Sequence, residues 1–143
     1  MATAFPPPAS MPFVHPDDMP KLYALRGVGR CMEPVISDGA LMVFDKELVP
    51  ARGDVVGLVF TQAYAQRWGA PGCVKRLKMD LPPPIDSRAF DGLVVVEQIN
   101  PPRTYTFRTS DVLAVHKCVG LAEPDSDNKG RARFRLKQEA PRC

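Results

Sequence analysis

The stretch Arg52-Gly53-Asp54-Val55-Val56-Gly57-Leu58-Val59-Phe60 decides the fold class. Its first three residues are typical of a turn, and the apolar run after them is typical of a short strand. The same unit, a turn signal followed by a short apolar or alternating run, recurs along the chain. We therefore expect a mainly β protein.

Further strands are predicted on both sides of this stretch. They cover residues 22–26, 40–44, 73–79, 93–96, 104–108 and 112–121, and a period-2 alternation predicts one more over residues 131–137. The 16 prolines cluster in runs that interrupt helices and central strands, so the elements should be short. Residues 64–72, with the only tryptophan, are predicted to be a loop, and no long helix is expected. About eight short strands fit a sandwich or a partly open barrel.

Composition predicts one globular domain. At 143 residues the chain is long enough to bury a core, and its net charge of +3 is too small to indicate nucleic acid binding. Residues 1–20 should form a flexible, Pro-rich N-terminal arm, and residues 21–143 one domain that ends in a basic strand carrying Arg131, Arg133, Arg135 and Lys137. Neither a transmembrane run nor a secretory signal is evident, so we expect a cytoplasmic protein with free thiols and no membrane contact. The four cysteines form no CxxC motif, and no metal site is expected.

Two segments carry the candidate chemistry. Gly29-Arg30-Cys31-Met32-Glu33-Pro34 sets a cysteine in a turn closed by proline, and Val74-Lys75-Arg76-Leu77 puts a lysine on a predicted strand. If folding brings them together, Cys31 and Lys75 make a nucleophile and its base, and backbone N–H groups of the turn face an oxyanion. Each residue also has a plainer interpretation: Lys75 as a surface lysine, and Cys31 as a buried structural cysteine.

These segments belong to an ordered set of motifs. Gly29-x-Cys31-Met32-Glu33-Pro34, followed by Asp38-Gly39, resembles the active-site signature of the LexA-like S24 peptidases, which is Gly-x-Ser-Met-x-Pro and then Asp-Gly. Residues 53–56 resemble the family's Gly-Asp-hydrophobic strand start, residues 74–77 its Val-Lys-Arg-Leu box, and Asn100-Pro101 its later turn. The motifs follow the family's order over residues 22–121.

The resemblance implies the complex β fold of the LexA and signal-peptidase proteins. It implies a Cys31–Lys75 dyad that hydrolyses a peptide bond by acyl transfer, in a cleft bordered by Gly29 and Met32, without cofactor or metal. It also implies a homodimer, a protein or peptide substrate, a repressor or recombinase filament as partner, and a role in transcription regulation, the SOS response, a phage or a mobile element.

The chain departs from the family pattern in three ways. Cys31 stands where the family has serine; only about 20 irregular residues precede the fold, too few for a DNA-reading helix-turn-helix; and neither an Ala-Gly bond nor a Cys-Gly bond before Cys31 is present. Self-cleavage of the usual kind is therefore not expected. The departures favour an alternative hypothesis, a non-enzymatic dimeric module that binds a repressor or another regulatory protein. A third hypothesis, a signal-peptidase relative, is weakened because no membrane anchor is present.

A cysteine changes the proton balance of such a dyad. A thiol ionises more readily than a lysine ammonium, so the proton should rest on Lys75, and the ion pair gains roughly 4 kcal/mol at about 4 Å and an effective dielectric near 20. Two outcomes are then open. In the first, Cys31 is the nucleophile and Lys75 is the acid for the leaving amine. In the second, the larger sulfur misplaces the attack and leaves a reactive thiol without turnover. Cys73, expected on the same strand face as Lys75, is either a core cysteine or a disulfide partner of Cys31 under oxidation.

Overall fold

The computed structural model describes residues 14–27, 29–82, 92–124 and 134–138, with backbone alone for residues 123–124 and 134–138. The fold is mainly antiparallel β, with 45% strand and 13% helix, and the sheet is not closed into a barrel. The prediction of a mainly β protein with little helix is therefore confirmed.

The predicted strands are present, most of them with ends shifted by one or two residues. They are β1 (Leu22–Arg26), β2 (Leu41–Asp45), β3 (Val55–Phe60), β4 (Gly72–Leu77), β5 (Leu93–Gln98), β6 (Arg103–Arg108), β7 (Val112–Pro124) and β8 (Phe134–Gln138). Strand β7 continues to Pro124, three residues beyond its predicted end at residue 121. The basic side chains of the β8 segment lie outside the described residues.

The prediction of a loop over residues 64–72 was wrong. This segment contains most of α1 (Gln62–Trp68). Thr61 caps the helix, since its hydroxyl accepts a hydrogen bond from the Tyr64 N–H, and Gly69 ends it in the left-handed conformation at φ 99°. Both caps are visible in the sequence, but the helix is only seven residues long, so its periodicity is too weak to recognise.

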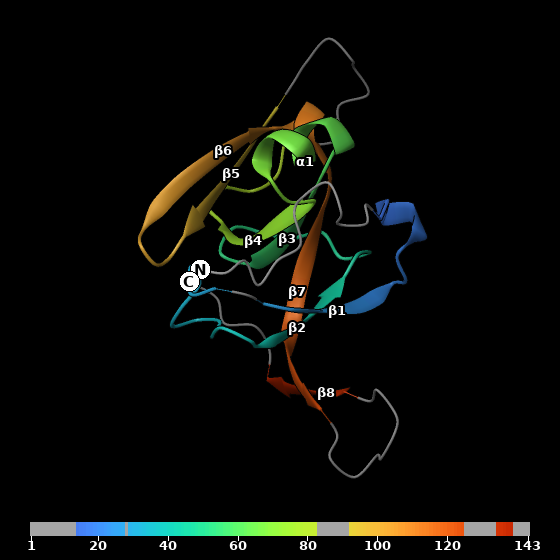
Figure 1. Cartoon of the computed structure of the whole chain (residues 1–143), viewed down its shortest axis with the longest axis vertical. Coiled ribbons are helices and arrows are strands. Elements are labelled where there is room, and N and C mark those ends of the chain that lie inside the picture. Colours follow the sequence, from blue (N-terminus) through green and yellow to red (C-terminus); the bar gives the residue numbers. More distant parts are fainter. Residues whose placement is uncertain (1–13, 28, 83–91, 125–133, 139–143) are drawn as a thin grey trace.

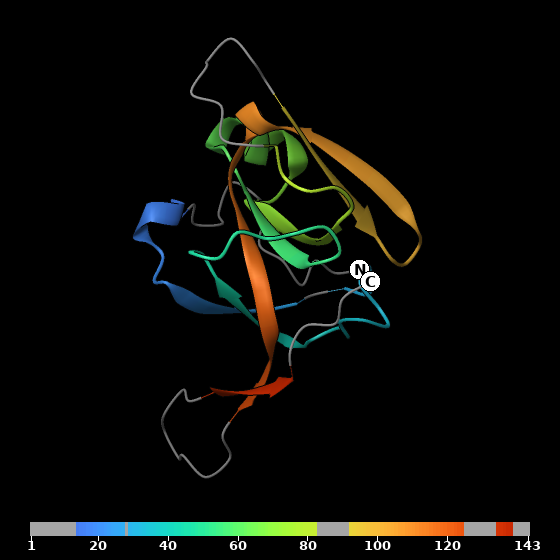
Figure 2. The same ribbon diagram turned by 180° about the vertical axis from the view of Figure 1, so that it is seen from behind.

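Strand β7 organises the sheet. The order is β1-β2-β7-β3-β4-β5-β6, with β8 pairing β7 off this path. The first half of β7 pairs β3 and the second half pairs β2 and β8, with Lys117 opposite both Val56 and Asp45. Figures 1 and 2 show β7 as the long strand that joins the β1–β2 end to the end that carries α1 and the β5–β6 hairpin.

Strand β3 is buried along its whole length and separates two apolar clusters. Cluster 1 gathers the β3–β6 side of the core and is covered by α1; its buried members are Val56, Leu58, Phe60, Leu77, Val94, Val96 and Phe107. Cluster 2 lies between β2, β7 and the segment before β2; its buried members are Met32, Ile36, Met42, Phe44, Val55 and Cys118. The candidate site lies where these two clusters meet.

The N-terminal arm expected over residues 1–20 extends into the described chain only from residue 14. There a short 3-10 helix, η2 (Pro16–Asp18), is capped by His15, and Pro16 is buried. The Lys46 ammonium donates a hydrogen bond to the Pro16 carbonyl at 3.1 Å, so this segment already packs on the sheet. A second 3-10 helix, η3 (Thr109–Asp111), joins β6 to β7. Within the described ranges, no helix has the length and apolar character needed to cross a membrane.

Candidate active site

Cys31 and Lys75 meet in the fold. The Lys75 Nζ lies 3.7 Å from the Cys31 Sγ, although 44 residues separate them. Lys75 is only 5% exposed, whereas Cys31 is half-buried. The interpretation of Lys75 as a surface lysine was therefore wrong, because the amine is enclosed and its one recorded hydrogen-bond partner among the described residues is the sulfur.

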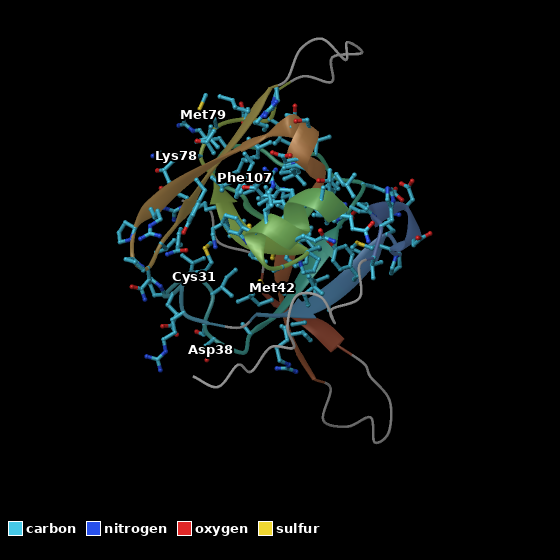
Figure 3. All side chains as sticks on the ribbon, turned by 45° about the horizontal axis from the view of Figure 1, so that its top comes forward. Cys31, Asp38, Met42, Lys78, Met79 and Phe107 are labelled. Carbon is cyan, nitrogen blue, oxygen red and sulfur yellow. The ribbon has the colours of Figure 1, made fainter. Side chains whose placement is uncertain are left out.

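The loop that carries Cys31 is held at its base. Gly29, at φ 95°, donates its N–H to the Asp38 carboxylate at 2.9 Å, and Gly39, at φ 86°, donates to the Gly27 carbonyl at 2.9 Å. Only glycine adopts such backbone angles without strain. Asp38, a residue of the motif, thus closes the loop between β1 and β2 that carries Cys31. Figure 3 shows Asp38 on the same side of the molecule as Cys31.

The turn after β5 fixes the backbone of Cys31 itself. The Cys31 carbonyl accepts hydrogen bonds from the N–H groups of Ile99, at 3.0 Å, and Asn100, at 2.8 Å. The Asn100 side-chain amide also donates to the Arg30 carbonyl at 3.3 Å. These contacts attach the loop that carries Cys31 to the β5–β6 hairpin, so the Asn100-Pro101 motif has a structural role at the site.

The register of β4 sets the direction of Lys75. Lys75 pairs with Val56 of β3 and shares its strand face with Cys73 and Leu77, which pack with cluster 1. The β5 strand pairs only with Arg76 and Leu77 of β4, so the β4 edge at Lys75 has no β5 partner within the register described. Cys31, which packs against cluster 2, reaches the lysine beside this part of the strand.

An aromatic ring also lies near the Lys75 amine. The Lys75 Nζ is 5.6 Å from the centroid of the Tyr105 ring, on β6. The Tyr105 ring packs edge-on against Trp68 of α1, at 5.6 Å between centroids, and stacks with Phe107, at 6.3 Å. Figure 3 places Phe107 close to α1. The amine therefore has both a thiol and an aromatic ring near it.

The two residues expected to border the cleft differ in position. Met32 is 4% exposed and belongs to cluster 2, so it packs in the core and anchors the loop. Gly29 is exposed, but its N–H is already bound to Asp38 and is not available to an oxyanion. Among the described residues, the Cys31 N–H has no recorded acceptor and is the better candidate donor. Pro34 lies within hydrogen-bonded turns rather than a helix.

The other described cysteines are chemically different from Cys31. Burial raises the pKa of Cys73 to about 12, and the nearby Lys75 charge only partly opposes this. Burial also raises the pKa of Cys118 to about 11. All three described cysteines are free thiols, and Cys73 packs against cluster 1. Cys73 and Cys118 therefore remain protonated at neutral pH, and Cys31 is the thiol that lies within hydrogen-bond distance of the Lys75 amine.

Sequence reasoning missed the supports of the dyad. The Asp38 carboxylate binds the Gly29 N–H, two residues before Cys31. The N–H groups of Ile99 and Asn100 bind the Cys31 carbonyl, and the Tyr105 ring lies near the Lys75 Nζ. Asp38 and Asn100 were visible as motif residues, but Tyr105 had no signal beyond strand alternation. Across the described ranges, no group of three or more His, Cys, Asp or Glu side chains is arranged to hold a metal ion. No family model, curated protein or solved structure matches this chain.

Proposed function

We propose that this chain is a peptidase of the kind the LexA-like S24 resemblance implies, with Cys31 as nucleophile and Lys75 as its proton partner. The observation that carries the proposal is a lysine that is 5% exposed and 3.7 Å from a thiol. A buried ammonium is costly unless a hydrogen-bonded counter-charge accompanies it. Within the described ranges no carboxylate is recorded within ion-pair distance of Lys75, so the Cys31 thiolate is the counter-charge at hand.

The reaction follows from this pair. The Cys31 thiolate attacks the carbonyl carbon of a peptide bond. The oxyanion that forms accepts a hydrogen bond from the Cys31 N–H. The Lys75 ammonium then donates its proton to the leaving amine, which departs and leaves a thioester on Cys31. The neutral Lys75 amine takes a proton from water, the resulting hydroxide equivalent attacks the thioester, and the acid product leaves with the thiolate restored.

The test is cleavage of a defined peptide library, read by mass spectrometry. Wild type should release new termini and accumulate an acyl adduct on Cys31 that hydroxylamine removes. Cys31→Ala should abolish both, and Lys75→Met should reduce both by at least about a hundredfold, as for loss of a general acid. Cys118→Ala serves as the thiol control, because the Cys118 side chain is only 1% exposed and cannot reach a substrate, so its loss should leave cleavage unchanged. Cleavage that survives Cys31→Ala would exclude the proposal.

A second candidate function, a dimeric binding module for a regulatory protein, is favoured by strand β1. It is the last strand at its end of the described sheet, and its Leu22 and Leu25 side chains are 53% and 48% exposed. An open strand edge with apolar side chains is a template for pairing with another chain. Leu22→Lys should then convert a dimer to a monomer in sedimentation without changing the reactivity of Cys31. A monomeric wild type would remove this candidate.

A further inference from the structure

We propose that Tyr105 is a positioning residue that holds the proton on Lys75, and so keeps Cys31 in its thiolate form. The inference deepens the proposed function and rests on it. Its basis is the place of the ring, 5.6 Å from the Lys75 Nζ, beside an amine that is otherwise enclosed and faces the Cys31 sulfur. A cation is attracted to the face of an aromatic ring, whereas a neutral amine is not, so the ring favours the ammonium form.

The sheet dictates this contact. Leu77 of β4 pairs with Val96 of β5, and Val96 pairs with Tyr105 of β6, so Tyr105 lies on the same sheet face as Leu77 and Lys75. Since β5 does not pair with β4 at Lys75, a large side chain from β6 can reach the amine diagonally. The ring is fixed there by Trp68 and Phe107 and needs no rearrangement to serve the lysine.

The proton equilibrium is Lys75–NH2 plus Cys31–SH on one side and Lys75–NH3+ plus Cys31–S− on the other. No bond to carbon forms or breaks, and one proton moves from sulfur to nitrogen. While the pair holds this one proton, anything that stabilises the ammonium raises the thiolate-to-thiol ratio by the same factor. When the pair takes up a second proton at lower pH, Lys75 is charged whether Cys31 is a thiol or a thiolate, and the ring no longer changes the ratio. A cation–π contact of ordinary strength corresponds to about fivefold in this ratio.

The experiment replaces Tyr105 by phenylalanine and by its 4-fluoro, 3,5-difluoro and 3,4,5-trifluoro forms, which keep the ring's size and progressively weaken its negative face. The readout is the thiolate-to-thiol ratio of Cys31 on the pH plateau where the pair holds one proton, between its two proton losses, from absorbance at 240 nm relative to a Cys31→Ser version of each variant. The phenolic oxygen contributes little, because its hydrogen bonds to Gln98 and Arg103 are long, at 3.5 Å.

We expect a stepwise fall that reaches about fivefold between phenylalanine and its trifluoro form, with unchanged thermal unfolding. A merely structural ring would give equal ratios along the series. Equal ratios along the series, together with a much lower thiolate-to-thiol ratio in Lys75→Met, would overturn the role of Tyr105 and leave the ion pair intact. An unchanged thiolate-to-thiol ratio in Lys75→Met would instead overturn the ion pair on which the proposed function depends, and the role of Tyr105 with it.

Discussion

Replacing Lys75 by methionine tests the ion pair without reference to any substrate. Methionine keeps the length and apolar stem of the lysine and removes only the charge and the hydrogen bond to the Cys31 sulfur at 3.7 Å. Two unit charges at this distance interact by roughly 4 kcal/mol at an effective dielectric near 20. Because Cys31 is half-buried and partly solvated, we take about half to two thirds of this as the loss in thiolate stability.

A loss of about 2.5 kcal/mol lowers the thiolate-to-thiol ratio about seventyfold. The alkylation rate falls by less, because a less stabilised thiolate is more nucleophilic, with a Brønsted slope of about 0.4–0.5. The two effects leave a net decrease of about tenfold at pH 6. At pH 8 the decrease should be much smaller, since an unpaired thiol is then substantially ionised.

The assay is iodoacetamide labelling of the folded protein, followed by trypsin and mass spectrometry of the peptide that spans residues 31–46. Cys73 and Cys118 are internal references and should stay unlabelled, since burial raises their pKa values to about 12 and about 11. Lys78→Met is the matched control, because Lys78 is exposed and bonds Thr104 at 2.9 Å, away from the sulfur. Equal labelling of Cys31 in wild type and Lys75→Met at pH 6 would refute the reasoning.

Three further predictions concern the framework of the site. Gly72→Ala should destabilise the fold by about 2 kcal/mol or more in urea unfolding, because a Cβ there would lie 2.0 Å from the Leu58 carbonyl oxygen; a change below about 0.5 kcal/mol would contradict this. Burial, aided by the Lys46 charge, lowers the pKa of His116. Below pH 6.5 the unfolded chain therefore binds a proton that the folded chain resists, and the stability of the fold decreases as the pH is lowered. His116→Gln should therefore show a smaller drop in melting temperature from pH 7 to pH 5.5 than wild type, and equal drops would exclude this origin. Asp38→Ala should cost about 1 kcal/mol of stability by freeing the Gly29 N–H, and should also slow Cys31 labelling at pH 6, whereas labelling at the wild-type rate would show that the loop needs no closure.

The strands, and the two residues that meet at the candidate site, could be predicted from the sequence for a physical reason. Alternation and turn residues are local signals, and they mark β3, β4 and β7 within a few residues of their ends. Cys31 and Lys75 stood out because a cysteine after glycines and a lysine on an apolar strand are unusual residues for their settings. Local signals could also name Asp38 and Asn100, but only as turn residues.

What sequence could not supply depends on contacts between distant segments. The burial of Lys75 follows from the pairing of β3 with β4 and from the Cys31 loop lying beside it. The approach of Tyr105 depends on the register of three strands, which no single segment encodes. For the same reason the resemblance implied that Met32 borders the cleft, and its place in the core became known only with the position of cluster 2.

The exchange of serine for cysteine has an energetic consequence for this fold. With serine at position 31, the buried amine of Lys75 would face a hydroxyl that stays neutral, and the lysine would have to give up its proton to avoid an unpaired charge. With cysteine, the nucleophile itself is the counter-ion, and the enclosed amine can keep its proton. The roles in the proposed reaction then change: a serine dyad needs the lysine first as a base, whereas a cysteine dyad with an ion pair needs the lysine first as an acid. The same burial of Lys75 is compatible with either chemistry, and the side chain at position 31 decides which one we propose.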